Sequence, residues 1–322
     1  MQVVHDTISK LTIPTPFAVG DTHVYLLKGD MLSLIDAGVK TAEAYDALTA
    51  QLKDLGYHPN DIEQIILTHH HPDHTGLVER FPKANTLAGH KNNDLWLTRN
   101  PEFFERFAQF YRDFFIASGV PQSFKGFLKK LEEPIHYAGE GKLTAFLEED
   151  NHLPGHGDWR VIETKGHAQS HLSFFREQDG AFIGGDHILE HISPNPIIEP
   201  PYDGEKERAK PLVQYRANLL KCLSLGISTV YPGHGINVLN IDELVPSQIK
   251  RQEQRAAKVL QMLEEDGEQT PFQLCQRLFP KQIAKQLDLT MSETTGQLDY
   301  LEECGKIRKA THKGIYYYHV IR

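Results

Sequence analysis

Four histidines and an aspartate fill five of six consecutive positions inside the stretch THHHPDHTG, residues 68–76. Histidine is the commonest metal ligand among side chains, and it titrates closest to neutral pH. In an extended segment, residues two apart point to the same side, so His69 and His71 can bind one ion together. Asp73 and His74 follow at the turn into a helix and can face a second ion. Because one loop cannot surround two ions, the fold must bring ligands from distant segments to this loop.

Three further ligand-type residues occupy similar positions along the chain. Each follows an apolar segment with strand character and lies beside glycine: His167 in TKGHAQSH, Asp186 in FIGGDH and His234 in YPGHG. Open α/β architectures place their binding sites at the carboxyl ends of strands. Neutral imidazoles and carboxylates suit zinc and leave coordination positions for water. The pattern therefore predicts a metal site that draws ligands from four separate segments.

Strand-like segments interleaved with helical ones indicate an α/β chain. Strands are expected at 9–14, 23–28, 31–36, 65–67, 86–89, 159–164, 172–176, 181–184 and 228–231. Helices are expected at 41–56, from Asp73 onward, at 206–225 and at 241–266. Residues 91–131 are also expected to be helical, and they hold ten of the thirty aromatic residues. This aromatic density sets 91–131 apart as an insert.

The chain is expected to divide into two domains joined by a helix. Residues 1–240 would form the larger domain, and the polar helix 241–266 would link it to residues 267–322. Within the last segment we expect three helices and a hairpin, at 270–279, 281–287, 291–304 and 306–321. Three helices followed by a hairpin predict a winged-helix-like module.

Composition excludes several classes of protein. No apolar run approaches the roughly 20 residues that span a bilayer, and the first residues lack the pattern of a secretory signal. We therefore expect a cytoplasmic location and no membrane contact. The three cysteines lie far apart, which is typical of reduced thiols. A net charge of −9 argues against a general nucleic-acid binder.

Over about residues 10–240 the sequence resembles the metallo-β-lactamase superfamily. LIDAG at 34–38, THHHPDHTG, TKGH, GGD and YPGHG occur in the order of that family's motifs, and the HxHxDH signature is specific. The resemblance implies an αββα sandwich, in which two facing β-sheets are covered by outer helices and the metals lie at one edge. It also implies two divalent metal ions, with Zn²⁺ expected and Mn²⁺ or Fe²⁺ as alternatives.

The same resemblance distributes the ligands between the two ions. The first ion would be held by His69, His71 and His167, the second by Asp73, His74 and His234, and Asp186 would bridge them. Asp36 resembles the family's aspartate that hydrogen-bonds a ligand and fixes its orientation. His171 is assigned to the same outer shell. His156 matches no motif of the family despite lying in a second PGHG, and we expect it to be a loop histidine.

Two metals that share a water molecule lower its pKa, so the expected nucleophile is a metal-bridging hydroxide and the reaction is hydrolysis. Asp73 is the catalytic candidate, placed to orient the hydroxide or to pass on its proton. Tyr202 and Asn195 are candidates for holding a developing oxyanion or the substrate. Each of them could equally be a loop-packing residue.

Three functions remain open from the sequence. The first is hydrolysis of a small thioester, ester or lactone. The second is a metal-dependent phosphodiesterase or endoribonuclease, and the third is a DNA-binding regulator that uses its C-terminal module. Residues 268–322 hold eight basic and six acidic residues, but helix 291–304 carries four acidic residues and no basic one. Such a helix would repel phosphates, so the acyl hydrolase ranks first and nucleic acid is an improbable partner.

The insert is expected to fold over the metals as a lid that limits substrate size. Phe107, Phe110 and Tyr111 fall on one side of a helix and are the expected lid residues. The alternative is that this face simply packs on the domain. A small-molecule substrate follows from the lid, and the C-terminal module is expected to serve packing or the contact of a homodimer.

Overall fold

The computed structural model describes residues 7–124, 126–127, 131 and 133–321, and its centre is a pair of β-sheets. The first sheet has the order β1 (Ile8–Ile13), β2 (Thr22–Lys28), β3 (Leu32–Ile35), β4 (Gln64–Ile66), β5 (Thr86–Gly89) and β6 (Ala145–Phe146). The second has the order β11 (Thr229–Pro232), β10 (Ala181–Gly185), β9 (Leu172–Arg176), β8 (His156–Glu163) and β7 (His152–Leu153). Strands β3 to β6 are mutually parallel, and β10 is parallel to β11.

Alternation along β2 shows how the sequence builds the layers. Tyr25 and Leu27 face the second sheet, where they pack with Trp159 and Phe174. The intervening residues belong to a second cluster on the outer face of the first sheet, which includes Leu48 of helix α1 (Ala42–Asp54). Successive side chains of a strand point to opposite faces, so one strand contributes to both layers. Each such fully buried side chain stabilises the fold by about 1.5–3 kcal/mol.

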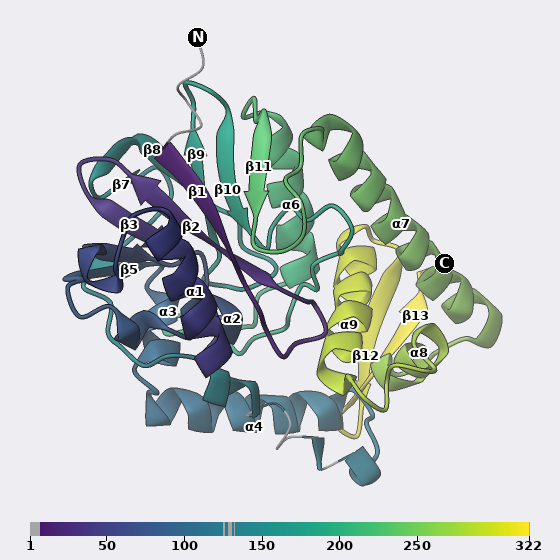
Figure 1. Ribbon diagram of the computed structural model, residues 1–322. Helices are drawn as coiled ribbons and strands as arrows, with labels where there is room; N and C mark the ends of the chain where they lie inside the picture. Colours follow the sequence, from purple (N-terminus) through teal and green to yellow (C-terminus); the bar gives the residue numbers. More distant parts are fainter. Residues whose placement is uncertain (1–6, 125, 128–130, 132, 322) are drawn as a thin grey trace.

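Helices cover both outer faces of the sheets (Figure 1). Helix α1 lies on the first sheet, and α6 (Pro211–Leu223) packs on the second with part of α7 (Ile241–Asp266). This is the expected αββα sandwich. Thr41 caps α1 by accepting a hydrogen bond from the Ala44 amide, which satisfies one of the free N–H groups at the helix start. Within the described residues, no helix is long and apolar enough to span a membrane.

The expected helix over 91–131 is interrupted. It consists of α3 (Asn92–Leu97) and α4 (Pro101–Ala117), and a 3₁₀ turn at Gln122–Phe124 follows. The break has a local cause, since Arg99 has a φ of 49° and Pro101 begins the second helix. Positions 125 and 128–130 of this range lie outside the described residues. Figure 1 shows α4 running along one side of the molecule from the sandwich to the C-terminal segment.

The C-terminal segment contains α8 (Pro271–Leu278), α9 (Leu287–Glu303), β12 (Ile307–His312) and β13 (Ile315–Val320). The expected helix at 281–287 is wrong. Residues 280–285 form turns, and of residues 280–286 only Ile283 is buried, too little apolar surface to hold a helical turn in place. Helix α9 starts at Leu287, earlier than the 291 expected from the sequence. The hairpin packs against α7 and α9 in a small core that includes Val259, Leu298 and Tyr318.

Candidate metal centre

The histidine-rich loop takes its shape from β4 and from Pro72. The loop leaves the carboxyl end of β4, and α2 (Pro72–Thr75) begins with proline, whose fixed φ suits the first helical position. His69 and His71 therefore precede the helix in an extended segment, and Asp73 and His74 sit in its first turn. His69 and His74 are fully buried, and Asp73 is nearly so.

The structure brings together all seven residues that the sequence assigns to the metals. These residues form three groups, and within each group the donor atoms lie within 4.8 Å of one another. The groups are His69, His71 and His167; His69, His74 and Asp186; and Asp73, His74 and His234. The His71 Nδ1 atom lies 2.9 Å from His69 Nε2 and 3.0 Å from His167 Nε2. On the other side, the His234 Nε2 atom lies 3.2 Å from Asp73 Oδ2.

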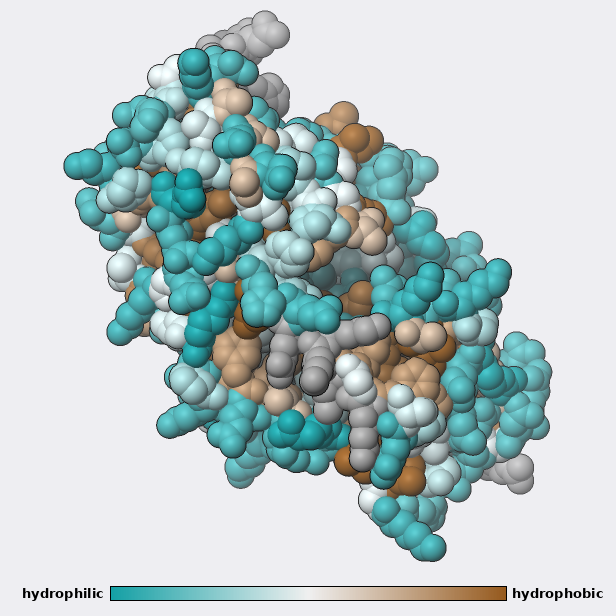
Figure 2. Space-filling model, turned by 60° about the horizontal axis from the view of Figure 1, so that its bottom comes forward, coloured by the Kyte–Doolittle hydropathy of each residue, from teal (hydrophilic) through white to brown (hydrophobic). Residues whose placement is uncertain are grey.

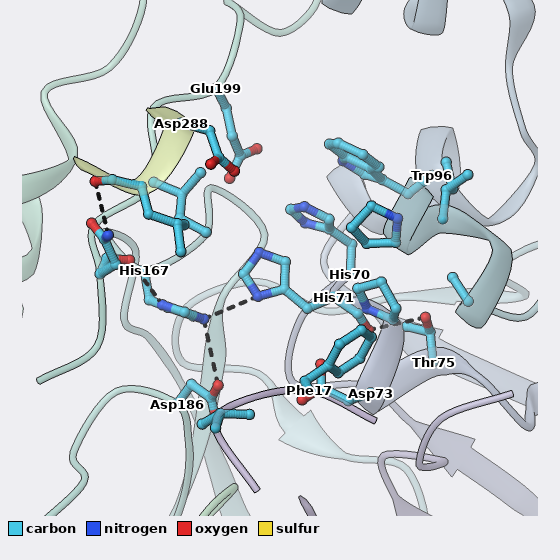
Figure 3. Close-up of a pocket in the computed structure, with 18 of the residues that line it drawn as sticks. Phe17, His70, His71, Asp73, Thr75, Trp96, His167, Asp186, Glu199 and Asp288 are labelled. Atoms are coloured by element: carbon cyan, nitrogen blue, oxygen red, sulfur yellow. Dashed lines mark hydrogen bonds and ion pairs between the residues drawn. The ribbon is translucent and has the colours of Figure 1, made fainter. Parts of the chain in front are cut away.

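The Asp186 carboxylate connects the two sides. Its Oδ2 atom lies 3.5 Å from His167 Nε2 and 3.4 Å from His234 Nε2, and its Oδ1 atom lies 3.5 Å from His74 Nε2. Figure 3 shows His71, His167 and Asp186 pointing toward one another across this centre. The Asp186 carboxylate therefore lies between the imidazoles of the two sides and contacts both.

Two observations fit divalent cations at this centre. The buried His74 Nε2 and Asp186 Oδ1 atoms face each other at 3.5 Å, and neither has a hydrogen-bond partner among the described residues. Buried polar atoms without hydrogen bonds are rare in proteins. Burial lowers the pKa of His69 and His71 well below the ordinary value, and it also lowers the pKa of His167. These rings are therefore neutral near pH 7, which is the form that binds metals.

Charge at the second group favours a cation as well. Burial alone would lower the pKa of His74, but the carboxylates of Asp186, Asp36 and Asp73 raise it well above the ordinary value. The same carboxylates that hold a proton on His74 would stabilise a divalent ion. The donor set of neutral imidazoles and carboxylates is the one that Zn²⁺ and related ions accept.

Carbonyl and carboxylate groups accept hydrogen bonds from the Nδ1 atoms of His74 and His234, and so fix the orientation of these rings. Asp36 Oδ2 accepts a hydrogen bond from His74 Nδ1 at 2.8 Å, and both Asp36 oxygens accept from Thr68. His234 Nδ1 donates to the Asp21 carbonyl at 2.8 Å. Because a carbonyl cannot donate, Nδ1 of His234 carries a proton, and Nε2 is the atom that faces the centre. Burial alone would lower the pKa of His234, but the carboxylates of Asp186 and Asp73 raise it to about 10, so a bound cation would take the place of the proton on Nε2.

His171 and His156 differ in their relation to the centre. His171 Nε2 accepts from the Asp186 amide at 3.0 Å, so it holds the main chain of that residue. The expectation that His156 is a loop histidine is wrong, because it is the buried first residue of β8 and its Nε2 lies 2.6 Å from Ser33 Oγ. It joins the two sheets away from the centre.

The glycine of YPGHG is required by close packing. A Cβ atom at Gly233 would overlap the Asp186 Oδ1 atom and would lie 2.8 Å from His74 Cε1. Only glycine lets the chain that carries His234 pass this close to the carboxylate. At the matching position of the other PGHG, Gly155, a Cβ atom would instead overlap the Met31 side chain, so the two copies of the tetrapeptide meet different neighbours.

A cavity of about 550 Å³ opens onto the centre. Its floor is formed by five of the proposed ligands: His71, Asp73, His167, Asp186 and His234. Its walls are mainly apolar, and the aromatic side chains among them are Phe17, Trp96, Phe104, Phe107 and Tyr111. In Figure 2 the face that carries α4 is hollowed, with hydrophobic side chains around the hollow. The volume lies within the roughly 300–1,000 Å³ range of small-molecule sites.

The structure separates the three expected lid residues. Phe107 and Tyr111 line the cavity, whereas Phe110 does not and packs instead in the cluster that joins α4 to the C-terminal segment. The reason is helical geometry. Successive side chains lie about 100° apart around a helix, so Phe110 points away from the direction in which Tyr111 meets the cavity. For Phe110, the expectation of a lid residue is wrong.

Tyr202 is not placed to hold an oxyanion. Its hydroxyl accepts a hydrogen bond from Trp96 Nε1 at 2.9 Å and donates to Glu199 Oε2. Trp96 in turn stacks on His70, with ring centroids 4.1 Å apart. Asn195 does line the cavity, and its Nδ2 donates to the Leu289 carbonyl at 2.9 Å.

Sequence reasoning missed Glu199, a buried carboxyl group in the wall of the cavity. It lies in the segment IIEPPY, where no motif or spacing distinguishes it. Besides Tyr202, it accepts a hydrogen bond from the Gln169 amide at 2.8 Å. Burial raises the pKa of Glu199 to about 7.

The raised pKa of Glu199 gives stability a defined pH dependence. The folded chain keeps a proton that the unfolded chain loses between its usual pKa and pH 7, so the free energy of unfolding falls as pH rises through this interval. We compare the free energy of unfolding of the wild type with that of Glu199→Gln. We expect the wild-type value to fall relative to that of the variant by about 3 kcal/mol between pH 4 and pH 8. Urea unfolding at several pH values measures it. The exposed control Glu177→Gln should not reproduce the change, and a pH-independent difference for Glu199→Gln would contradict the prediction.

Comparison with known proteins identifies the family. The model of the metallo-beta-lactamase superfamily matches residues 18–234. A Bacillus subtilis (strain 168) protein named probable metallo-hydrolase YqjP is 40% identical over 297 residues, which cover 92% of this chain and 92% of that protein. The atrochrysone carboxyl ACP thioesterase of Aspergillus fumigatus is 24% identical over 254 residues, 78% of this chain and 62% of that protein. The crystal structure of the metallo-beta-lactamase family protein TTHA1429 from Thermus thermophilus matches with a TM-score of 0.82 and 27% identity, covering 98% of this chain and 99% of that one. With the ligand geometry above, these likenesses show that the chain belongs to the metallo-beta-lactamase superfamily and is a metal-dependent hydrolase.

Proposed function

We propose that the chain is a dinuclear hydrolase of the HxHxDH type that acts on a small thioester, ester or lactone. The observation that carries this proposal is the apolar, aromatic-walled cavity that opens directly onto the cluster of imidazoles and carboxylates. An acyl group can enter such a cavity while its carbonyl reaches the floor. The relative named as an ACP thioesterase supports a thioester within this class.

The ligand groups would hold two divalent ions, with Zn²⁺ expected. His69, His71 and His167 would bind the first and Asp73, His74 and His234 the second, with Asp186 between them. Ions bound in this way supply an acidified water molecule and polarise the carbonyl oxygen. No serine or cysteine nucleophile is then needed.

The side chains of the site orient and shield the reaction. Asp73 lies at the floor of the cavity, 3.2 Å from His234 Nε2, where its carboxylate can orient the attacking water and accept its proton. Asp36 holds His74, and His171 holds the amide of Asp186. The stacked rings of His70 and Trp96 form a wall that excludes bulk water from the substrate.

We further propose that the C-terminal segment is a winged-helix-like module that does not read DNA. A recognition helix must present an exposed face to the major groove. Helix α9 is instead buried along most of its length, and Gly296 packs directly against Leu212 of α6. This burial supports a packing role over that of a DNA-binding regulator.

A substrate panel tests the proposed function. The metal-loaded protein should hydrolyse short apolar thioesters or esters faster than a phosphodiester or RNA, because the cavity suits an apolar acyl group. A strong chelator should abolish the activity, and added Zn²⁺ should restore it. Faster cleavage of RNA or of bis(p-nitrophenyl) phosphate than of any acyl substrate would favour the alternative of a phosphodiesterase or endoribonuclease.

Substitutions test the metal ligands. We expect His167→Ala and Asp186→Ala each to abolish hydrolysis and to lower the bound metal from about two ions per chain. Asp36→Ala should reduce activity by about 10–100-fold, the usual cost of losing a group that orients a ligand. His156→Ala is the matched control, since it removes a buried histidine from the other PGHG. It should keep its metal and lose about 1–3 kcal/mol of stability with the Ser33 contact. Equal loss of metal in His156→Ala and His167→Ala would contradict the assignment.

Two phenylalanines one helical turn apart test the wall of the cavity. Phe107→Ala should raise KM for short acyl substrates by about ten-fold, equivalent to about 1.4 kcal/mol of lost contact, with metal content unchanged. Phe110→Ala, on the same helix but outside the cavity, should leave KM within about two-fold of wild type. Steady-state kinetics and metal analysis provide the measurements, and an equal effect on KM in both variants would contradict a specific role for Phe107.

A further inference from the structure

The first turn of α9 reaches the catalytic cavity. Asp288 and Leu289 line it, although they lie more than 50 residues beyond His234 in the sequence. Leu287 is buried in the cluster that also contains Tyr111 of α4. Figure 3 shows Asp288 facing the same space as Glu199, above His167 and His71. The cavity is therefore enclosed by the sandwich, the insert and the C-terminal module together.

A chain of two hydrogen bonds connects α9 to His167. The Leu289 carbonyl accepts from Asn195 Nδ2 at 2.9 Å, and the Asn195 carbonyl accepts from His167 Nδ1 at 3.0 Å (Figure 3). Nδ1 must carry the proton, because its partner is a carbonyl. The orientation of the ring, and hence the direction of the Nε2 lone pair, therefore depends on where the Asn195 carbonyl lies.

The segment that contains Asn195 has no regular secondary structure of its own. Its position is set by contacts to other elements. The Ile198 amide donates to Ser292 Oγ of α9 at 3.2 Å, and the Ile198 carbonyl accepts from Tyr111 of α4 at 2.5 Å. The Ile197 amide also donates to the His167 carbonyl at 3.4 Å. With the Asn195 bond, the segment makes three contacts to helices, and two of them come from α9. A loop held in this way can keep His167 within the narrow range of orientations that a metal ligand needs.

We propose that the C-terminal module is a working part of the active site: through Asn195 it positions His167, and through Leu289 it closes one wall of the substrate cavity. The proposal rests on the proposed function in one respect, which is that His167 binds a metal ion. Asn195 is then a positioning residue and Leu289 a specificity residue. A module that served only packing would require neither the hydrogen bond from Asn195 to Leu289 nor the contact of Leu289 with the cavity.

Variants of the full-length protein separate the two roles. Asn195→Ala removes the donor to Leu289 and should weaken Zn²⁺ binding by about ten-fold, at the lower end of the usual 10–100-fold cost of such groups. Competition with a chromogenic chelator measures this affinity without any substrate. Leu289→Ala keeps the carbonyl that accepts from Asn195, so metal affinity should stay within two-fold. It removes part of the wall, so KM for short acyl substrates should rise and the preferred acyl chain should lengthen.

Gln51→Ala is the matched control for Asn195→Ala. Gln51 Nε2 donates to the Thr12 carbonyl at 2.8 Å, which joins α1 to β1, and Gln51 does not line the cavity. The Gln51→Ala variant should have a lower free energy of unfolding in urea than the wild type, with the same affinity for Zn²⁺. Asn195→Leu, which keeps the volume of the side chain but not its donor, serves if Asn195→Ala does not fold.

Three results would overturn the proposal. The first is unchanged metal affinity in Asn195→Ala and Asn195→Leu. The second is an equal loss of affinity in Gln51→Ala, which would show a general effect of destabilisation. The third is an acyl-chain preference that Leu289→Ala leaves unaltered. A wild-type protein that binds two ions but hydrolyses no acyl substrate would refute the proposed function, while the affinity comparison for Asn195 would still decide the positioning role.

Discussion

The structure is organised around one buried carboxylate, that of Asp186. An ionised carboxylate removed from water costs several kcal/mol unless positive charge surrounds it. Here the nitrogens of three imidazoles lie within 3.5 Å of its oxygens, on side chains that come from separate segments. Burial would raise the pKa of Asp186, but His234 and His74 hold it well below the ordinary value. Two sheets whose strands end at one edge are the arrangement that lets distant segments meet around this group.

Much of the fold and all seven residues of the proposed ligand set could be predicted from the sequence, because these features have local signals. Strands such as β2 and β9 are apolar runs, and His69 to His74 form a dense cluster with a fixed spacing. The two-residue strands β6 and β7 were missed, since so short a segment has no periodicity to detect. Their pairing is imposed by longer neighbours, a tertiary effect that propensity does not contain.

Other features depend on contacts between distant residues, and the two PGHG tetrapeptides illustrate the limit. His234 reaches the metal centre because β11 pairs with β10, which places it beside Asp186. His156 begins β8 and instead contacts Ser33 of the opposite sheet. Identical tetrapeptides thus take different roles according to strand pairing. Glu199 shows the same limit, because its burial depends on Trp96 and Tyr202, which meet only in the folded chain.

The aromatic density of the insert has a physical explanation in its two buried faces. A helix that packs on a single surface needs one apolar stripe. Helix α4 packs on two: Phe107 and Tyr111 line the cavity, while Phe114 and Phe115 lie in the cluster with Phe272 of the C-terminal module. Because Tyr111 belongs to both surfaces, a shift of the module against α4 would move the wall of the cavity. The shape of the substrate site is therefore determined by a contact between two segments that contribute none of the proposed metal ligands.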